Sequence, residues 1–238
     1  MGGFEFLIDG LLKALQLISS GDPLIATITL LSIRVSVTAT LLGAIFGIPA
    51  GFLIARKDFV GKSIITTVVN TSMGLPPVVV GLVIYLMLSS FGPLGFLKLL
   101  YTPEAMIIAQ TVLTLPIACG ITISVVMSLN PKLKEALISL SAPGIWEALI
   151  LLNESRLGLI TAIITAFGGA ISEVGAIMMV GGNLGGFTQA LTTSIMLYTN
   201  MGDFDTAIAL GIILLTIAFG VNLFLTLLQS RSKIKRTA

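Results

Sequence analysis

The sequence has no histidine, a single cysteine (Cys119), and charged residues at only 10% of its 238 positions. Without histidine, the chain cannot form a Ser-His or Cys-His catalytic pair or a histidine-containing metal site. One cysteine cannot form an intrachain disulfide. We therefore expect no enzyme active site, no metal centre and no cofactor bound by this chain.

Hydrophobic residues make up 55% of the chain, and its mean hydropathy of +1.08 is far above that of soluble domains. A helix that crosses a bilayer takes about 20 apolar residues, which leaves room for five or six spans and no separate soluble domain. The composition predicts an all-α polytopic membrane protein with one domain over residues 1–238. The net charge of +2 calls for no nucleic-acid partner.

Five apolar segments are long enough to span as helices, and they cover residues 24–55, 63–90, 104–129, 157–180 and 205–228. Residues 4–19 instead carry apolar side chains at helical spacing, with Glu5, Asp9 and Lys13 on the other side. This segment is too short and too charged to span, so we expect an amphipathic helix on the membrane surface. A sixth, weakly hydrophobic span packed on the bundle is the alternative.

Lysine and arginine cluster on one side of these spans, as is typical of cytoplasmic loops. They are Arg56, Lys57, Lys62, Lys132, Lys134, Arg156, Arg231, Lys233, Lys235 and Arg236. With five spans, the C-terminus and the connection at residues 131–147 are predicted to be cytoplasmic and the N-terminus outside.

This connection is the one polar, helix-forming segment between long apolar spans. Pro131 suits a first helical residue, and Pro143-Gly144 ends or bends the helix before a second helical run with Trp146. A helical loop without further role is one interpretation. The other is a short helix that docks a soluble partner.

Glu135-Ala136, followed by Ser141 and Ala142, resembles the E-A-A…G loop of permease subunits of ABC importers. Residues 170–176 (A-I-S-E-V-G-A) and 178–183 (M-M-V-G-G-N) resemble the tungstate-type branch of the molybdate/tungstate permeases. The likeness covers roughly residues 25–228. Leu137 and Ser141 depart from the loop pattern, which expects alanine and glycine there.

The resemblance implies a prokaryotic plasma-membrane importer in which two copies of this chain carry two ATP-binding cassette subunits and receive an oxyanion from an extracytoplasmic binding protein. Tungstate is the expected oxyanion, with molybdate next and sulfate behind. The expected ATPase-coupling residues are Lys132, Lys134, Glu135, Ala136, Ser141, Ala142, Gly144 and Trp146.

Gly74-Leu75-Pro76-Pro77 lies in the middle of the second predicted span, where two prolines remove two backbone donors and prevent a straight helix. Broken spans often line the path of transporters, although proline kinks also serve packing. We predict a path formed by this break and the fourth span. Its expected residues are Ser72, Met73, Pro76, Pro77, Ser172, Glu173, Gly175 and Met178.

Glu173 is the one acidic residue deep in a predicted span, and a carboxylate there is costly unless it is paired. Counting about 1.5 Å per helical residue places Arg34 at a similar depth, so we predict an outer charge pair between Arg34 and Glu173. A Glu173 that only fixes helix packing and an Arg34 that reaches the membrane interface are the alternatives.

Gly61-Lys62-Ser63 ends like a phosphate-binding loop, but Arg56 stands where that motif needs its first glycine. A driving ATPase must therefore be a separate chain. The alternative function is an ion-coupled secondary transporter that works without an ATPase, which the shortage of intramembrane charge and the lack of an obvious inverted repeat disfavour.

Overall fold

The computed structural model describes residues 3–139 and 144–237, and it is helical with no strand in these two ranges. The helices are α1 (Gly3–Ser19), α2 (Pro23–Arg56), α3 (Lys62–Ser72), α4 (Pro77–Leu88), the 3-10 turn η1 (Gly95–Leu97), α5 (Pro103–Met127), α6 (Pro131–Ser139), α7 (Gly144–Ser172), α8 (Gly175–Gly181), α9 (Leu191–Met201) and α10 (Phe204–Thr237). The expected all-α fold is confirmed.

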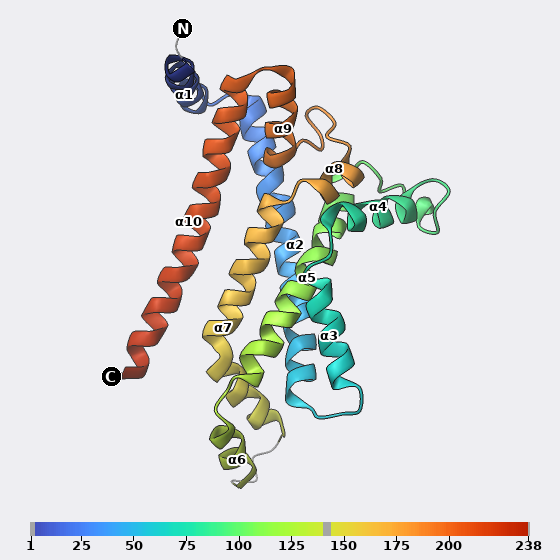
Figure 1. Cartoon of the computed structure of the whole chain (residues 1–238), viewed down its shortest axis with the longest axis vertical. Helices are drawn as coiled ribbons and strands as arrows, with labels where there is room; N and C mark the ends of the chain where they lie inside the picture. The colour runs from blue at the N-terminus through green and yellow to red at the C-terminus, as the bar shows by residue number, and fades with distance from the viewer. Residues whose placement is uncertain (1–2, 140–143, 238) are drawn as a thin grey trace.

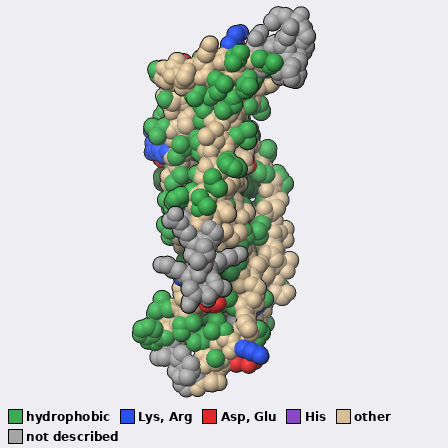
Figure 2. All heavy atoms as spheres, turned by 90° about the vertical axis from the view of Figure 1, so that its left-hand side faces the viewer, with side chains coloured by type: hydrophobic (Ala, Val, Ile, Leu, Met, Phe, Trp, Pro, Cys, Tyr) green, Lys and Arg blue, Asp and Glu red, His purple; other side chains and the backbone are tan. Residues whose placement is uncertain are grey.

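Four helices, α2, α5, α7 and α10, are long and apolar enough to cross a membrane, and α3 with α4 forms a fifth candidate span that is bent by 96°. Figure 1 shows the four long helices running along the bundle, with α4 nearly at right angles to them. The face that carries α10 is rich in hydrophobic side chains (Figure 2). Leu215 and Phe219 on α10 are each 71% exposed, as expected for side chains that face lipid.

The packing of α2 against α5 depends on glycines spaced four residues apart on one face of α2. A Cβ at Gly47 would lie 2.7 Å from the carbonyl oxygen of Leu115, so only glycine permits this approach. A Cβ at Gly51 would meet the carbonyl oxygen of Cys119, and one at Gly43 would meet the side-chain hydroxyl of Thr114. Small residues at this spacing are how membrane helices come close together.

The two ends of the bundle carry different elements (Figure 1): α1 and α9 lie at one end, and α6 lies at the other with the C-terminal end of α10. Ala14 of α1 packs into a core cluster with Leu210 of α10, and Lys13 forms an ion pair with Asp205 at 3.2 Å. α1 does not run the length of the bundle (Figure 1), and its placement on the membrane surface stays a prediction.

The structure departs from the predicted fourth span both in where it begins and in its continuity. The prolines divide the second span as expected, but the predicted fourth span, residues 157–180, is also interrupted. α7 begins at Gly144 and ends at Ser172, and the chain turns at Glu173 and Val174 before α8. No proline marks this second break, which is why the sequence did not reveal it.

Candidate translocation site and coupling segment

The break between α3 and α4 is set by the backbone. α3 ends at Ser72, Pro76 has the extended conformation of an N-cap residue (ψ 120°), and Pro77 is the first residue of α4. Neither proline has an N–H group, so neither can continue the hydrogen bonding of α3. A proline at the first helical position costs nothing there, and α4 can restart at once.

The break between α7 and α8 is held by side chains from three helices. Glu173 Oε1 accepts the N–H of Ala176 at 2.8 Å, and Thr192 of α9 donates to the Glu173 carbonyl at 2.7 Å. From α5, Gln110 Nε2 donates to the Ala170 carbonyl at 2.8 Å, while Ser172 Oγ donates to the Gly168 carbonyl at 2.7 Å. The Ala176 N–H and the Glu173 carbonyl are backbone groups of the break itself, where the regular helical bonds stop. The Ala170 and Gly168 carbonyls lie in the last turns of α7, and Ala170 also accepts the Glu173 N–H at 3.3 Å.

The two breaks are in contact, because α4 packs tightly on α8. A Cβ at Gly81 would lie 2.7 Å from Cα of Ala176, and a Cβ at Gly175 would meet the side chain of Val78 at 2.5 Å. Backbone therefore lies against backbone at the first contact, and neither helix can shift toward the other.

A cavity of about 110 Å³ lies between the two breaks and α5. It is lined by Met73, Leu75, Pro77, Gln110, Leu113, Thr114, Ile117, Gly169, Ala170 and Glu173. Three of the predicted path residues, Met73, Pro77 and Glu173, thus come together from two spans that are far apart in the sequence.

The other predicted path residues lie around this cavity without lining it. Ser72 borders a separate apolar groove between α3 and α5, and Pro76 caps α4. Ser172 bonds within α7, Gly175 packs on Val78, and the carbonyl of Met178 accepts the N–H of Gly182 at the end of α8.

Gln110, Thr114 and Thr192 are site residues that the sequence interpretation missed. Gln110 is 2% exposed and is the amide side chain within the apolar run of α5. A buried amide must find hydrogen-bond partners, so this polar residue in an apolar span was a usable signal.

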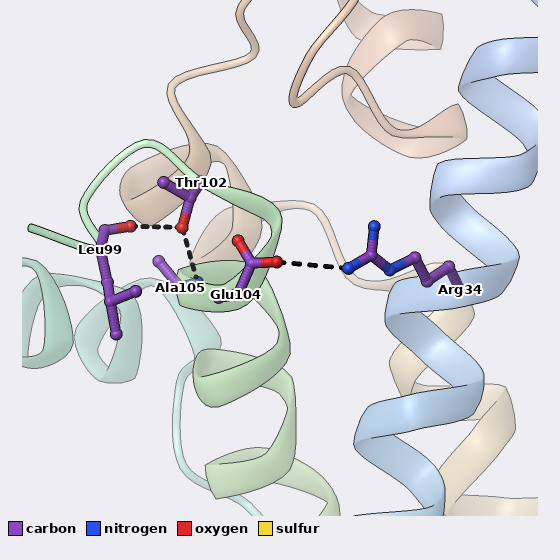
Figure 3. A network of polar contacts seen from close by, with 5 residues as sticks. All are labelled: Arg34, Leu99, Thr102, Glu104 and Ala105. Carbon is purple, nitrogen blue, oxygen red and sulfur yellow. Dashed lines mark hydrogen bonds and ion pairs between the residues drawn. The ribbon is translucent and has the colours of Figure 1, made fainter.

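The predicted ion pair between Arg34 and Glu173 is wrong. Arg34 Nη2 pairs with Glu104 Oε1 at 3.2 Å (Figure 3), while the Glu173 carboxylate turns to the N–H of Ala176. The prediction rested on depth along the helices, and depth does not determine which way a side chain points around the helix axis. Glu104 lies in the first turn of α5, where a negative charge interacts favourably with the helix dipole.

The coupling segment has one anchored face and one exposed face. Leu137 of α6 is 6% exposed and packs in a cluster with Phe52, Val126 and Leu151. The predicted coupling residues Lys132, Glu135, Ala136, Gly144 and Trp146 are exposed. Lys134 lies on α6, and Ser141 and Ala142 lie outside the described residues. The exposed face is available for a partner.

Arg56, the last residue of α2, fastens the start of α7 next to this segment. Its guanidinium donates to both carboxylate oxygens of Glu147, at 2.6 and 3.3 Å, and to the Gly144 carbonyl at 2.9 Å. The Arg56 and Glu147 side chains are 22% and 31% exposed. A two-point arginine–carboxylate contact fixes orientation as well as distance, so α2 and α7 are held together at this end.

Residues 47–234 match the family model described as "Binding-protein-dependent transport system inner membrane component". The chain belongs to this family. As a family member it is the membrane permease subunit of an ABC importer, an ATP-driven transporter, and the alternative of a secondary carrier is not supported. The chain is a transport component in a membrane that it crosses several times. A bacterial ABC transporter that imports alginate has the same fold, with a TM-score of 0.73 at 18% identity over 97% of this chain and 90% of that one.

Several permeases of anion importers are similar to this chain. A probable anion ABC transporter permease of Haloferax volcanii is 44% identical over 83% of this chain and 88% of that protein. The tungstate uptake permease TupB of Peptoclostridium acidaminophilum is 41% identical over 94% of this chain and 99% of that protein. TupB of Campylobacter jejuni is 36% identical over 98% of this chain and 95% of that protein.

Proposed function

We propose that this permease subunit carries tungstate into the cytoplasm, driven by ATP hydrolysis on a separate subunit. The observation that carries the proposal is the identity of 41% and 36%, over nearly the whole length, to two tungstate uptake permeases. We rank molybdate second and sulfate third in preference as the transported oxyanion. No nucleotide site is expected on this chain itself.

The working unit is a homodimer with the path between its two copies. In support, α4 leaves the apolar residues Val79, Val83 and Leu86 more than half exposed, and the space around Gly168 on α7 is open. Exposed apolar surface beside a break suits packing against a second copy. The path-lining role of the predicted residues rests on this dimer.

The end that carries α6 faces the cytoplasm, with the C-terminus on the same side and the N-terminus outside, as the lysine and arginine distribution favours. Two ATP-binding subunits dock on the exposed face of α6 and the first turn of α7. Because Arg56 links Glu147 and Gly144 to α2, a push on this segment moves α2 and α7 together. An extracytoplasmic binding protein delivers the oxyanion at the opposite end.

Selectivity lies with the binding protein. The ten described residues that line the cavity between the breaks include no lysine or arginine. A strong cationic site inside a path would retain a divalent oxyanion instead of releasing it. The permease thus provides a gated route and not a tight binding site.

Reconstitution tests the substrate and the energy source together. The permease, its ATPase and its binding protein are placed in vesicles, and uptake of labelled tungstate is measured with and without ATP. We expect ATP-dependent uptake that molybdate inhibits more than sulfate does. Uptake by the permease alone under a proton or sodium gradient would contradict the proposal.

The docking role of α6 is tested with Glu135→Lys. Glu135 is exposed, so the variant should fold and insert normally but copurify with several-fold less ATPase. Asn200→Lys, which adds a lysine at an exposed site on α9 at the other end of the bundle, is the control. Equal ATPase recovery with both variants would show that Glu135 is not part of the docking surface.

A further inference from the structure

An apolar groove of about 370 Å³ lies between α1, α2 and α10, at the end of the bundle that carries α9 (Figure 1). Along α2 its lining runs from Asp22 past Leu30 to Ile33, and Leu17 of α1 and Ile213 of α10 belong to the other walls. Leu30 is 69% exposed, so the groove is open on the side where this residue lies. Among the described residues that line it, Asp22 alone is charged.

The groove has the direction and the length of an acyl chain. It follows the axis of α2, and the distance from Asp22 to Ile33 is about 16 Å at about 1.5 Å per residue. One leaflet contributes about half of the roughly 30 Å hydrocarbon layer of a bilayer. A chain that enters at the end of the bundle and runs along the groove therefore reaches the depth that a lipid tail of one leaflet occupies.

A polar hollow adjoins this groove, and Leu17 lines both of them. The other residues around the hollow are Lys13, Gln16, Ser20 and Asp205. Lys13 Nζ lies 3.2 Å from Asp205 Oδ2, and the two side chains are 63% and 34% exposed, so a bound group can reach both charges. Charges of both signs beside an apolar groove are what a phospholipid requires.

The headgroup must decide which lipid binds. Lipid tails are as apolar as leucine, so an acyl chain gains little when it leaves the bilayer for the groove. Lys13 is the one cation among the described residues that line the groove or the hollow, whereas Asp22 and Asp205 are both carboxylates. An anionic headgroup would meet more negative than positive charge, while a headgroup with a phosphate and an ammonium complements both signs.

The groove is also on the side of the bundle that meets the bilayer. In Figure 1, α1 and α10 lie on the side opposite to α4. A second copy that packs against α4, as in the proposed homodimer, leaves the side of α1 and α10 uncovered. The nearest available occupant is then a lipid.

We propose that α1, α2 and α10 form a binding site for one phospholipid whose headgroup carries an ammonium, with this headgroup at Lys13 and Asp205 and one acyl chain along the groove. The headgroup links α1 to α10, and the chain fills the space between α2 and α10. Assignment to the outer leaflet rests on the orientation proposed above. The site itself does not depend on which oxyanion is transported.

Native mass spectrometry tests the headgroup. The assembled transporter is purified from nanodiscs with equal amounts of phosphatidylethanolamine and phosphatidylglycerol, and the retained lipids are counted. We expect at least fivefold more phosphatidylethanolamine, up to one molecule per copy of this chain. Asp205→Asn should abolish the preference, whereas Asp58→Asn, which removes the carboxylate paired with Lys62 at 2.9 Å, should preserve it. Equal retention of both lipids by the unaltered transporter, a preference for phosphatidylglycerol, or an unchanged preference in Asp205→Asn would overturn the proposal.

The acyl chain is tested by filling the groove. Ala26 lines the groove and is exposed, so Ala26→Phe adds a ring there without entering the protein core. We expect this variant to retain at least fivefold less phosphatidylethanolamine. Val37→Phe is the control, because Val37 is exposed on α2 but does not line the groove. Equal lipid retention by the two variants would show that no chain lies in the groove.

A structure of the unaltered transporter in the same nanodiscs gives a test that does not depend on how a variant folds. We expect continuous density along the groove from Asp22 to Ile33, ending in a phosphate within about 4 Å of Lys13 Nζ, the range of an ion pair. A helix of a second copy in the groove, or a groove without density, would overturn the proposal. Neither result depends on transport, so the lipid site and the proposed function fail or stand separately.

Discussion

The two helix breaks beside the cavity arise in different ways. Between α3 and α4, Pro76 and Pro77 remove backbone donors, so the local sequence at residues 74–77 is enough to cause the break. Between α7 and α8 there is no proline, and the turn at Glu173 is held by Gln110, Thr192 and the glutamate's own carboxylate. The first break is local, whereas the second exists only when α5 and α9 are in place.

This difference suggests how the two breaks behave when the transporter changes state. A proline break stays bent in any environment, because the missing N–H groups cannot be restored. A break held by hydrogen bonds from neighbouring helices responds when those helices move. The α7–α8 break is therefore the one that can respond when the coupling segment moves, because α7 extends from that segment to the break.

The largest effect is expected where the two breaks touch. Gly81→Val places a side chain against the backbone of α8, which cannot shift away without separating the breaks. We expect a loss of about 1–3 kcal/mol in stability, seen as a lower thermal unfolding midpoint in detergent, and strongly reduced uptake. Gly220→Val on α10 is the matched control, since Gly220 is exposed and a Cβ there meets no described atom within 4 Å. A stable Gly81→Val would mean that the breaks are independent.

The carboxylate at the second break is tested by Glu173→Ala and Glu173→Gln. Alanine removes the acceptor for the Ala176 N–H and should cost about 0.5–2 kcal/mol, the range for losing a side-chain acceptor at a helix N-terminus, although Val174 is the N-cap residue of α8. Glutamine keeps an acceptor oxygen, so its unfolding midpoint should stay near that of the unaltered chain. If glutamine is as harmful as alanine, the negative charge matters and the cap does not explain the residue.

A smaller effect is expected for Thr192→Val, which removes the hydroxyl that reaches the Glu173 carbonyl but keeps the shape of the side chain. We expect a loss of about 1 kcal/mol in unfolding free energy. Thr29→Val is the matched control, because Thr29 Oγ1 is buried without a partner among the described residues and its loss should be neutral or stabilising. Equal shifts in both variants would mean that α9 does not hold the second break.

The smallest effect should follow replacement of the prolines. Pro77→Ala keeps a compatible backbone position, and its cost of about 0.4–1 kcal/mol comes mainly from the greater freedom of the unfolded chain. In the double variant with Pro76→Ala, spin labels on α3 and α4 should show a broader distance distribution, because the bend is no longer enforced. An unchanged distribution would show that packing on α8, and not proline, keeps α4 in place.

Particular residues show how far sequence interpretation reached at the site. Pro76 and Pro77 predicted the first break, and the E-A-A-like loop indicated α6 with its exposed Glu135. Glu173 was recognised as a functional candidate, but its partner was predicted to be Arg34, which pairs instead with Glu104. Gln110 was missed because its importance comes from contacts 60 residues away in the chain, at Ala170.

The sequence by itself determined the apolar spans, the proline break, the family and the segment between α5 and α7, because these follow from composition, backbone chemistry and short motifs. Only the tertiary structure decided that a second break lies at Glu173, that it meets the first across Gly81 and Ala176, and that Gln110 of α5 donates to the Ala170 carbonyl near the end of α7. Those features depend on how far each helix is rotated about its axis, and apolar residues all round a membrane helix leave that rotation unspecified until neighbouring helices pack against it.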